Sequence, residues 1–165
     1  MRHLSQFNYC PKCGSRRFVE NNFKSERCED CGFVYYFNAC GATVAIILND
    51  KNELLVATRA HEPAIGTLDL PGGFIDMNET AEEAVCREVK EETGLDITEV
   101  KYLFSLPNIY LYSGFEVQTI DLFFWCKANS YAVLKPDDDV ARLEFIEVGK
   151  LRPELFGLAS IRKGI

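Results

Sequence analysis

The sequence has no long hydrophobic run. Its longest apolar stretch, Ala42–Leu48, is far shorter than the roughly 20 residues that cross a bilayer as a helix. It also lacks low-complexity tracts and internal repeats, and apolar residues make up 47% of the chain, so we expect a globular protein. Histidine is scarce, and we expect neither His3 nor His61 to be catalytic. No hydrophobic segment follows Met1–Leu4, so we expect a cytoplasmic protein with no secretory signal.

Positive charge is also in short supply. The 165 residues include 18 Lys and Arg against 25 Asp and Glu, a net charge of −7. Residues 1–40 hold six Lys and Arg and four Asp and Glu, which leaves −9 for the rest of the chain. This acidic body makes nucleic acid an unexpected partner, although the mildly basic start keeps a weak version of that idea open.

Two C-x2-C-G motifs near the start of the chain are separated by 14 residues. This spacing is typical of a zinc ribbon, in which four thiolates bind one Zn²⁺ ion, here from Cys10, Cys13, Cys28 and Cys31. Four protein ligands close the site, so we expect the zinc to be structural. The alternative, two disulfides in a secreted domain, finds no support because no signal peptide is seen.

The zinc ribbon divides the chain in two. A lobe of about 35 residues cannot bury enough core to fold alone, and the metal supplies what is missing. We expect the ribbon at residues 1–38 and a second domain at residues 39–165. The remaining cysteines, Cys40, Cys86 and Cys126, fit a reducing cytosol, and we expect them to be packed thiols.

Three carboxylates lie within one helical turn of each other in the segment that follows Thr80. At about 100° per residue, Glu88 and Glu92 continue an apolar helix face, with Glu91 on its flank. Arg87 and Lys90 fall on the opposite side, so no cation is expected on the carboxylate face. Because clustered carboxylates repel each other, the pattern predicts a hard divalent cation among them, Mg²⁺ or Mn²⁺.

The ends of this helix and the loop before it are marked as well. Thr80 and Glu83 form a capping-box pattern, and Gly94 is a typical left-handed stop. Ahead of the helix, Pro71-Gly72-Gly73 predicts a tight loop in which glycine lets the backbone approach a metal or a phosphate.

The segment GFIDMNETAEEAVCREVKEETGL resembles the signature of the Nudix hydrolases, G-x5-E-x7-R-E-U-x-E-E-x-G-U with U aliphatic. Every fixed position is present: Gly73, Glu79, Arg87, Glu88, Val89, Glu91, Glu92, Gly94 and Leu95. Weaker similarity runs from about Ala42 to the region of Leu155.

The resemblance implies a divalent-metal-dependent hydrolase that cleaves the diphosphate of a nucleoside diphosphate linked to another group. By position, Glu88, Glu91 and Glu92 are the implied metal ligands, with the Gly73 carbonyl as a fourth. Arg87 is four residues before Glu91 and can pair with it or with Glu79, which would orient the carboxylates. We interpret Glu79 as a structural or supporting residue.

Two further residues are candidates for direct roles. In this family the general base is a glutamate of the signature or an acidic residue in a later loop, so Glu88 and Asp139 are both open. Asp139 ends an acidic run that is more often a solvated turn. Arg59, at the end of a predicted strand, could reach a phosphate, although a surface arginine is the commoner case.

Apolar and β-branched segments predict strands at Ala42–Leu48, Leu54–Arg59, Val100–Leu106 and Thr119–Ala128. With the carboxylate helix and a short helix expected near Val148–Phe156, they indicate an α/β protein with a mixed sheet between helices. The Nudix resemblance implies the same α/β/α sandwich.

A zinc ribbon ahead of a Nudix domain is similar to the arrangement in NADH pyrophosphatases. That subfamily carries S-Q-P-W-P-F-P after the signature, where this chain has Ser105-Leu106-Pro107-Asn108-Ile109-Tyr110. Because only the serine and the first proline match, the substrate stays open among NAD(H), ADP-ribose, other dinucleotides and nucleotide sugars. Two hypotheses of another class are a nucleotide sensor without catalysis and a zinc-ribbon adaptor. Many members of the family are dimers, so a homodimer is also open, with no stretch that identifies an interface.

Overall fold

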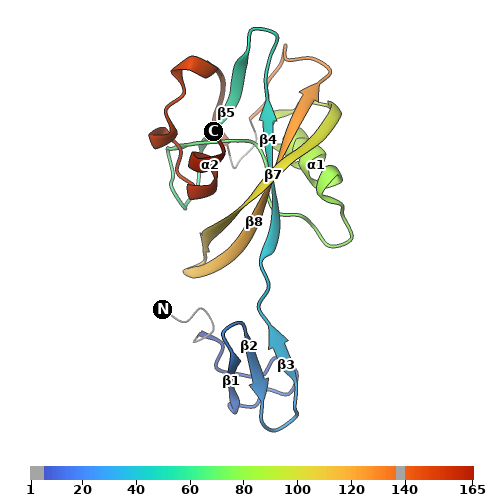
Figure 1. The fold of residues 1–165 in the computed structure, drawn as a ribbon, viewed down its shortest axis with the longest axis vertical. Coiled ribbons are helices and arrows are strands. Elements are labelled where there is room, and N and C mark those ends of the chain that lie inside the picture. Colours follow the sequence, from blue (N-terminus) through green and yellow to red (C-terminus); the bar gives the residue numbers. More distant parts are fainter. Residues whose placement is uncertain (1–5, 137–139) are drawn as a thin grey trace.

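The computed structural model describes residues 6–136 and 140–165. Three short strands form an antiparallel sheet at one end of the molecule, in the order β1–β2–β3 (Figure 1). Their bounds are Phe18–Asn22 for β1, Ser25–Cys28 for β2 and Val34–Tyr36 for β3. A short link then carries the chain into the larger body.

The larger body contains two three-stranded sheets and two helices. The first sheet has the order β4–β8–β7, with β4 parallel and β7 antiparallel to β8, and the second has the order β6–β5–β9. The bounds are β4 Cys40–Ile47, β5 Glu53–Arg59, β6 Leu68–Asp69, α1 Ala81–Thr93, β7 Ile97–Tyr112, β8 Phe115–Ala128, β9 Val140–Glu147 and α2 Ala159–Gly164. All four predicted strands are present, and the one expected at Val100–Leu106 is part of the longer β7.

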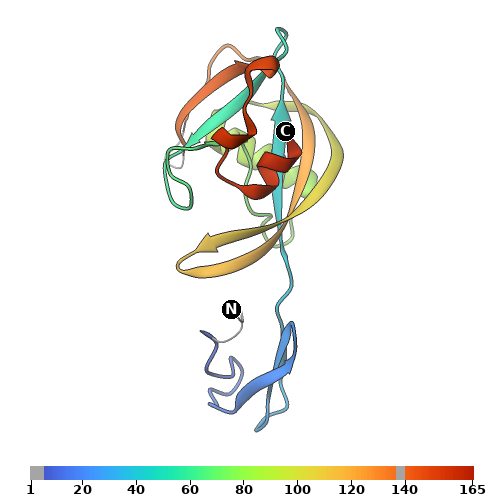
Figure 2. The same cartoon turned by 60° about the vertical axis from the view of Figure 1, so that its left-hand side comes forward.

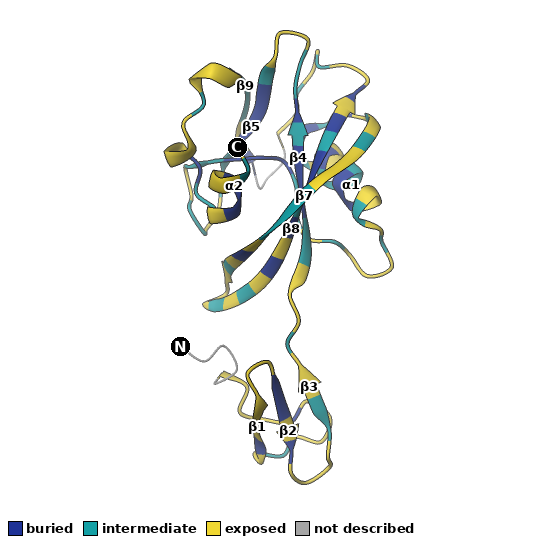
Figure 3. Cartoon of the chain, viewed as in Figure 1, coloured by how far each residue is buried: buried dark blue, intermediate teal, exposed yellow. Residues whose placement is uncertain are grey.

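Alternating side chains of β4 and β8 pack into two separate hydrophobic cores. Ala45 and Phe124 pack with α1 on one face, whereas Val44 and Phe123 pack with Ile161 of α2 on the other. The two helices therefore lie on opposite sides of this sheet (Figure 1), and the buried positions follow the sheet between them (Figure 3). The predicted α/β/α sandwich with a mixed sheet is confirmed.

Helix α1 begins and ends where the sequence predicts. The Thr80 hydroxyl accepts a hydrogen bond from the Glu83 N–H, and the Glu83 carboxylate accepts one from the Thr80 N–H. Gly94 follows in the left-handed conformation, and its N–H donates to the Lys90 carbonyl. These caps fix the rotation of the helix, and with it the direction of the three carboxylates.

The prediction of a short helix near Val148–Phe156 is wrong. Two 3-10 turns, Val148–Lys150 and Pro153–Leu155, occupy that stretch, and a six-residue helix, α2, comes only afterwards. Proline disfavours the helical conformation in the residue before it, and Arg152 is extended. Among the residues described, no helix is both long and apolar enough to pass through a membrane.

The long β7–β8 hairpin reaches toward the three-stranded sheet at the start of the chain (Figure 2). At its tip, the ring of Phe115 lies 5.4 Å from the ring of Phe7, which in turn lies 4.7 Å from Phe37. These edge-on and tilted aromatic contacts join the segments on both sides of the small sheet to the hairpin.

Candidate metal and substrate site

The loop before α1 packs directly against the carboxylates of the helix. A Cβ atom added at Gly73 would lie 2.6 Å from the Glu88 carboxylate, so a larger residue here would force that carboxylate to move. The Gly72 N–H donates to the Glu92 carboxylate at 3.0 Å. The loop and two of the three predicted ligands thus form one unit.

Strand β4 holds this loop in place. The N–H groups of Thr43 and Ala45 donate to the carbonyls of Gly73 and Pro71, both at 2.8 Å. The Gly73 carbonyl also accepts a long hydrogen bond from the Thr43 hydroxyl at 3.5 Å, so a metal ion would compete with this weak contact for the second lone pair. The role of this carbonyl as a fourth metal ligand, which the resemblance implies, remains a prediction.

Arg87 crosses the carboxylate cluster. Its guanidinium contacts Glu79 at 2.9 Å, Glu88 at 2.7 Å, Glu91 at 3.0 Å and the Phe74 carbonyl at 3.0 Å. The pairing with Glu79 and Glu91 agrees with the spacing. The prediction that no cation lies among the carboxylates is wrong, because a long side chain at the edge of the helix reaches around to them.

Burial favours a higher pKa for Glu79 and Glu88, and Arg87 favours a lower one. The side chain of Glu88 is 16% exposed, and burial raises its pKa although Arg87 opposes the shift. The hydrogen bonds from Arg87 lower the pKa of Glu79, which also accepts from the Asp76 N–H. Arg87 itself stays charged, since Glu79 raises its pKa.

The three glutamates do not converge on one point. Within residues 6–136 and 140–165, the four cysteines are the one group of potential ligand atoms close enough to share an ion. Arg87 draws Glu88 and Glu91 together, while Glu92 turns to the Gly72 N–H. The ligand roles of the glutamates remain predictions, and Asp139 lies outside the described residues.

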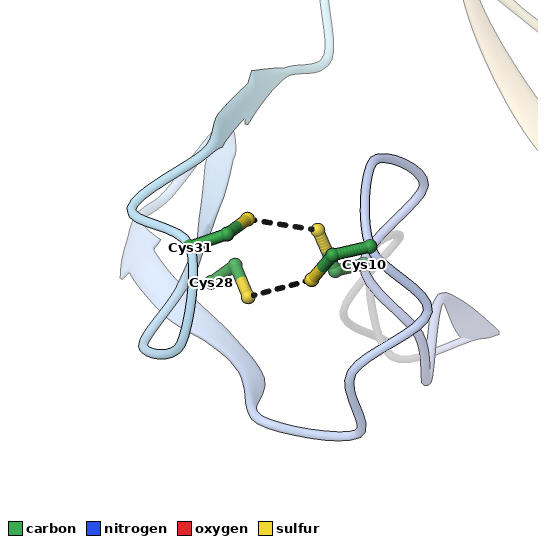
Figure 4. A group of neighbouring side chains, drawn as sticks. Cys10, Cys28 and Cys31 are labelled. Carbon is green, nitrogen blue, oxygen red and sulfur yellow. Dashed lines mark hydrogen bonds between the residues drawn. The ribbon is translucent and has the colours of Figure 1, made fainter.

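The four predicted zinc ligands lie together beside the small sheet, where Cys28 ends β2 and the other three lie outside the strands. Figure 4 shows Cys10, Cys28 and Cys31 pointing toward a common centre. The Sγ atoms of Cys10 and Cys31 are 3.7 Å apart, and those of Cys13 and Cys28 are 3.6 Å apart. A tetrahedral site with Zn–S bonds of about 2.3 Å separates its sulfurs by roughly 3.8 Å. All seven cysteines are free thiols, so the disulfide alternative is not seen. The Cys31 and Asp30 N–H groups help to lower the pKa of Cys28 to about 6, which favours the thiolate.

The remaining cysteines differ from one another. Cys126 is buried and Cys86 half-buried, both within the core beside α1, as expected of packed thiols. Cys40 is exposed, so the prediction of a packed thiol is wrong there. It is the first residue of β4 and lies outside the core.

Arg59 is held inside a cleft and is not a surface residue. Its side chain is 15% exposed, and it donates to Asp69 at 2.6 Å, to the Pro63 carbonyl at 2.6 Å and to the Tyr110 hydroxyl at 3.1 Å. Burial lowers the pKa of Arg59 and Asp69 raises it, with a net rise. As the structure stands, its donors serve protein groups, and contact with a phosphate remains a prediction.

The cleft has two adjoining parts that share Arg59, Gly72, Gly73, Phe74 and Tyr110. The outer part includes Glu88 and measures about 1080 Å³ with its open mouth. The inner part measures about 530 Å³ with its mouth. The carboxylate helix therefore faces a space that continues inward from the predicted metal ligands.

Sequence reasoning missed four of the polar residues that line the inner part: Asp69, Asn108, Thr119 and Asp121. All four are buried. One signal was available, since Thr119 and Asp121 occupy the same face of β8 as the core residue Phe123. A polar side chain at an inward position of an apolar strand has to be paired or to serve a ligand.

A Gly-rich loop joined to a carboxylate helix, on a mixed sheet between helices, lies beside a cleft large enough for a ligand. Residues 40–163 match the sequence profile of the NUDIX domain, and the chain belongs to this family.

Known relatives agree with this assignment. The chain is 34% identical over 106 residues to the NAD-capped RNA hydrolase NudC of Vibrio atlanticus, a match that covers 64% of this chain and 39% of the relative. The chain thus spans about two fifths of the length of the curated relatives it matches. Among solved structures, a NUDIX hydrolase from Nitrosomonas europaea superposes with a TM-score of 0.72 at 21% identity, covering 94% of this chain and 86% of that one. The NUDIX domain of Shewanella oneidensis NrtR, solved with ADP ribose, has a TM-score of 0.56 at 20% identity over 68% of this chain and 75% of that one.

Proposed function

We propose that the protein is a hydrolase dependent on Mg²⁺ or Mn²⁺ that cleaves the diphosphate of a nucleoside diphosphate linked to another group, with NAD(H) and ADP-ribose as leading substrates. The observation that carries this proposal is the packing of Gly73 against the Glu88 carboxylate, within a complete Nudix signature. The likeness to an NAD-capped RNA hydrolase and to a NUDIX domain solved with ADP ribose supports NAD-type and ADP-ribose-type ligands.

In this proposal the residues of the signature have separate roles. Glu88, Glu91 and Glu92, with the Gly73 carbonyl, hold the metal ions, which when bound offset the diphosphate charge and make a bound water more acidic. Arg87 and Glu79 orient the acids. Because the carboxylates do not converge, we expect Arg87 to release Glu88 and Glu91 in part when metal binds.

The reaction consumes one water molecule. Its oxygen forms a bond to one phosphorus, the bond from that phosphorus to the bridging oxygen breaks, and two phosphate monoesters leave. A base takes the proton from the water, and Glu88 and Asp139 are both candidates. Glu88 faces the cleft from the half-buried side of α1.

We also propose a structural Zn²⁺ ion held by Cys10, Cys13, Cys28 and Cys31, with a domain boundary between residues 38 and 39. The sulfur separations fit a tetrahedral site, and four protein ligands leave no open position for catalysis. Seven free thiols suit the reducing cytoplasm, where we place the protein.

A homodimer is a further part of the proposal. Strand β7 is the last strand of its sheet, and it exposes Ile109, Leu111 and Tyr112. An apolar sheet edge of this kind is prone to pair with another chain. Sedimentation equilibrium at micromolar concentration tests it, and a monomer at all concentrations would contradict it.

The test of function is a panel of NADH, NAD⁺, ADP-ribose, a diadenosine polyphosphate, UDP-glucose and an NAD-capped RNA. Each is incubated with Mg²⁺, with Mn²⁺ or with a chelator, and the products are separated. Metal-dependent cleavage of one phosphoanhydride bond in any of them, which gives two products that each carry a terminal phosphate, supports the proposal. Tight binding with no cleavage would instead favour the nucleotide-sensing alternative. Salt-dependent binding of uncapped RNA would revive the adaptor hypothesis, which the acidic body disfavours.

A further inference from the structure

The inner part of the cleft ends on a floor of buried polar groups. Asn108 is 7% exposed, Thr119 and Asp121 are each 4% exposed, and Asp69 is 8% exposed. Burial of polar groups costs free energy unless each finds a partner. The partners of these four groups therefore indicate whether the floor is structural or serves a ligand.

Three of the four groups are satisfied within the protein. Asp121 accepts hydrogen bonds from the hydroxyls of Thr119 at 2.7 Å and Ser160 at 2.5 Å. Asp69 accepts from Arg59 at 2.6 Å and from the Leu70 N–H at 2.9 Å. These contacts fix both carboxylates rigidly at the base of the cleft.

The side chain of Asn108 is the exception. Its carboxamide has no hydrogen bond with any residue of the described ranges 6–136 and 140–165, yet it is more than nine-tenths buried and lines the cleft. A carboxamide offers two N–H donors and one carbonyl acceptor. It lies opposite Thr119 in the pairing of β7 with β8, and the Thr119 hydroxyl in turn donates to the Asp121 carboxylate, which lines the same part of the cleft.

The charge of the floor decides which part of a ligand fits there. Two carboxylates, Asp69 and Asp121, face a single guanidinium, Arg59. Burial raises the pKa of Asp69, and Asp121 adds a smaller contribution in the same direction. Arg59 offsets one carboxylate, so the floor offers mainly hydrogen-bond acceptors, which favour groups that donate N–H bonds.

The walls of the cleft suit a planar ring. Phe74 and Tyr110 stand edge to face with ring centroids 5.7 Å apart, and both line the inner and outer parts. Glu88 lines the outer part. A ligand whose diphosphate lies at the metal helix can therefore run along these rings and place its other end on the floor.

We propose that Asn108, beside the Asp121 carboxylate, is a specificity-determining residue that recognises the amide-type edge of a planar ring, which carries an N–H donor next to an acceptor. The nicotinamide carboxamide and the amino edge of adenine share this chemistry. The proposal deepens the proposed function and rests on it for the position of the diphosphate.

The test measures binding without turnover. Isothermal titration compares nicotinamide mononucleotide, AMP and ribose 5-phosphate on the full chain, with Asn108→Leu and Asn108→Ser beside the wild type. Asn129→Leu, an exposed position outside the cleft, is the matched control. We expect one of the two nucleotides to bind more than about tenfold more tightly than ribose 5-phosphate, and both Asn108 variants to reduce that preference about tenfold, because one unmet buried hydrogen bond is worth about a factor of ten.

Two further ligands show whether the floor recognises the carboxamide of nicotinamide or the amino edge of adenine. Nicotinic acid mononucleotide replaces the carboxamide by a carboxylate, and IMP replaces the adenine amino group by an oxo group. Loss of binding on the first change assigns the floor to nicotinamide, and loss on the second assigns it to adenine.

The outcomes separate this inference from the proposed function. A wild type without ring preference, or a preference of equal size in the wild type and in both Asn108 variants, overturns the inference even if hydrolysis is observed. If the ring preference depends on Asn108 but the protein cleaves no substrate, the result supports the recognition site and contradicts the proposed hydrolase activity. If the leucine variant does not fold, the serine variant decides.

Discussion

The guanidinium of Arg87 binds both oxygens of the Glu79 carboxylate, with Nε–Oε1 and Nη2–Oε2 distances of 2.9 Å each. This paired contact fixes the plane of the guanidinium, whose remaining nitrogen reaches Glu88 and Glu91. Glu79 thus acts on the predicted metal ligands through Arg87, from the loop ahead of the helix.

Replacement of Arg87 by Lys keeps the charge but removes the paired contact. We expect the Mg²⁺ concentration that gives half-maximal activity to rise about 10–100-fold, a typical effect of losing a residue that orients ligands. Lys90→Arg, on the exposed side of α1, is the control and should leave it unchanged. Equal metal dependence in Arg87→Lys and the wild type would contradict an orienting role.

Gly73→Ala tests the contact between the loop and the helix. The new Cβ would lie 2.6 Å from the Glu88 carboxylate, so the acid or the loop has to move. We expect kcat/KM to fall at least about tenfold with little loss of melting temperature, because a small misplacement of reacting groups is costly. Gly149→Ala, where a Cβ meets nothing within 4 Å, is the matched control. Unchanged kinetics in Gly73→Ala would separate the loop from the site.

Removal of one predicted zinc ligand tests the ribbon. Cys31→Ser should lower the zinc content, measured by mass spectrometry of the metal, from about one per chain to a small fraction, and the small sheet should lose protection from hydrogen exchange. Cys40→Ser, at an exposed thiol outside the cluster, should retain the metal. Full zinc occupancy in Cys31→Ser would contradict a four-thiolate site.

Glu26 gives the ribbon a pH dependence. It is buried on β2, its Oε2 atom has no hydrogen-bond partner within the described residues, and burial raises its pKa. The folded state therefore holds this proton more tightly than the unfolded state, so stability falls as the pH rises through the raised pKa. Glu26→Gln should raise the melting temperature at pH 8, and the gain should shrink toward pH 5. Glu82→Gln, at an exposed position, should show no such trend. A gain that is equal at both pH values would contradict this account.

The sequence predicted the elements of the fold whose signals lie within a few neighbouring residues. The caps at Thr80 and Gly94 and the apolar strands depend on short patterns, and the structure confirms them. The helix predicted near Val148–Phe156 is not formed, because Pro153 disfavours the helical conformation at Arg152. This proline could be seen in the sequence.

The sequence could suggest candidate site residues where they share one helix or one short motif. The three glutamates share one helix, and the cysteines share two short motifs. The floor of the cleft combines Asn108 of β7 with Asp121 of β8 and Asp69 of β6, which only the tertiary fold brings together. Arg87 shows the same limit, because helix geometry places its Cα but not the far end of a long side chain.

The most direct test of the central claim compares Glu91→Gln and Glu92→Gln with Glu82→Gln, an exposed glutamate of the same helix, in Mg²⁺-dependent turnover of the substrate that the panel identifies. The account predicts that Glu82→Gln keeps wild-type kcat/KM, while the other two variants lose at least about 100-fold, as expected when electrostatic stabilisation of a developing charge is removed. Near-wild-type turnover in Glu91→Gln and Glu92→Gln, or equal losses in all three variants, would contradict the assignment of this helix as the metal-binding centre of a diphosphate hydrolase.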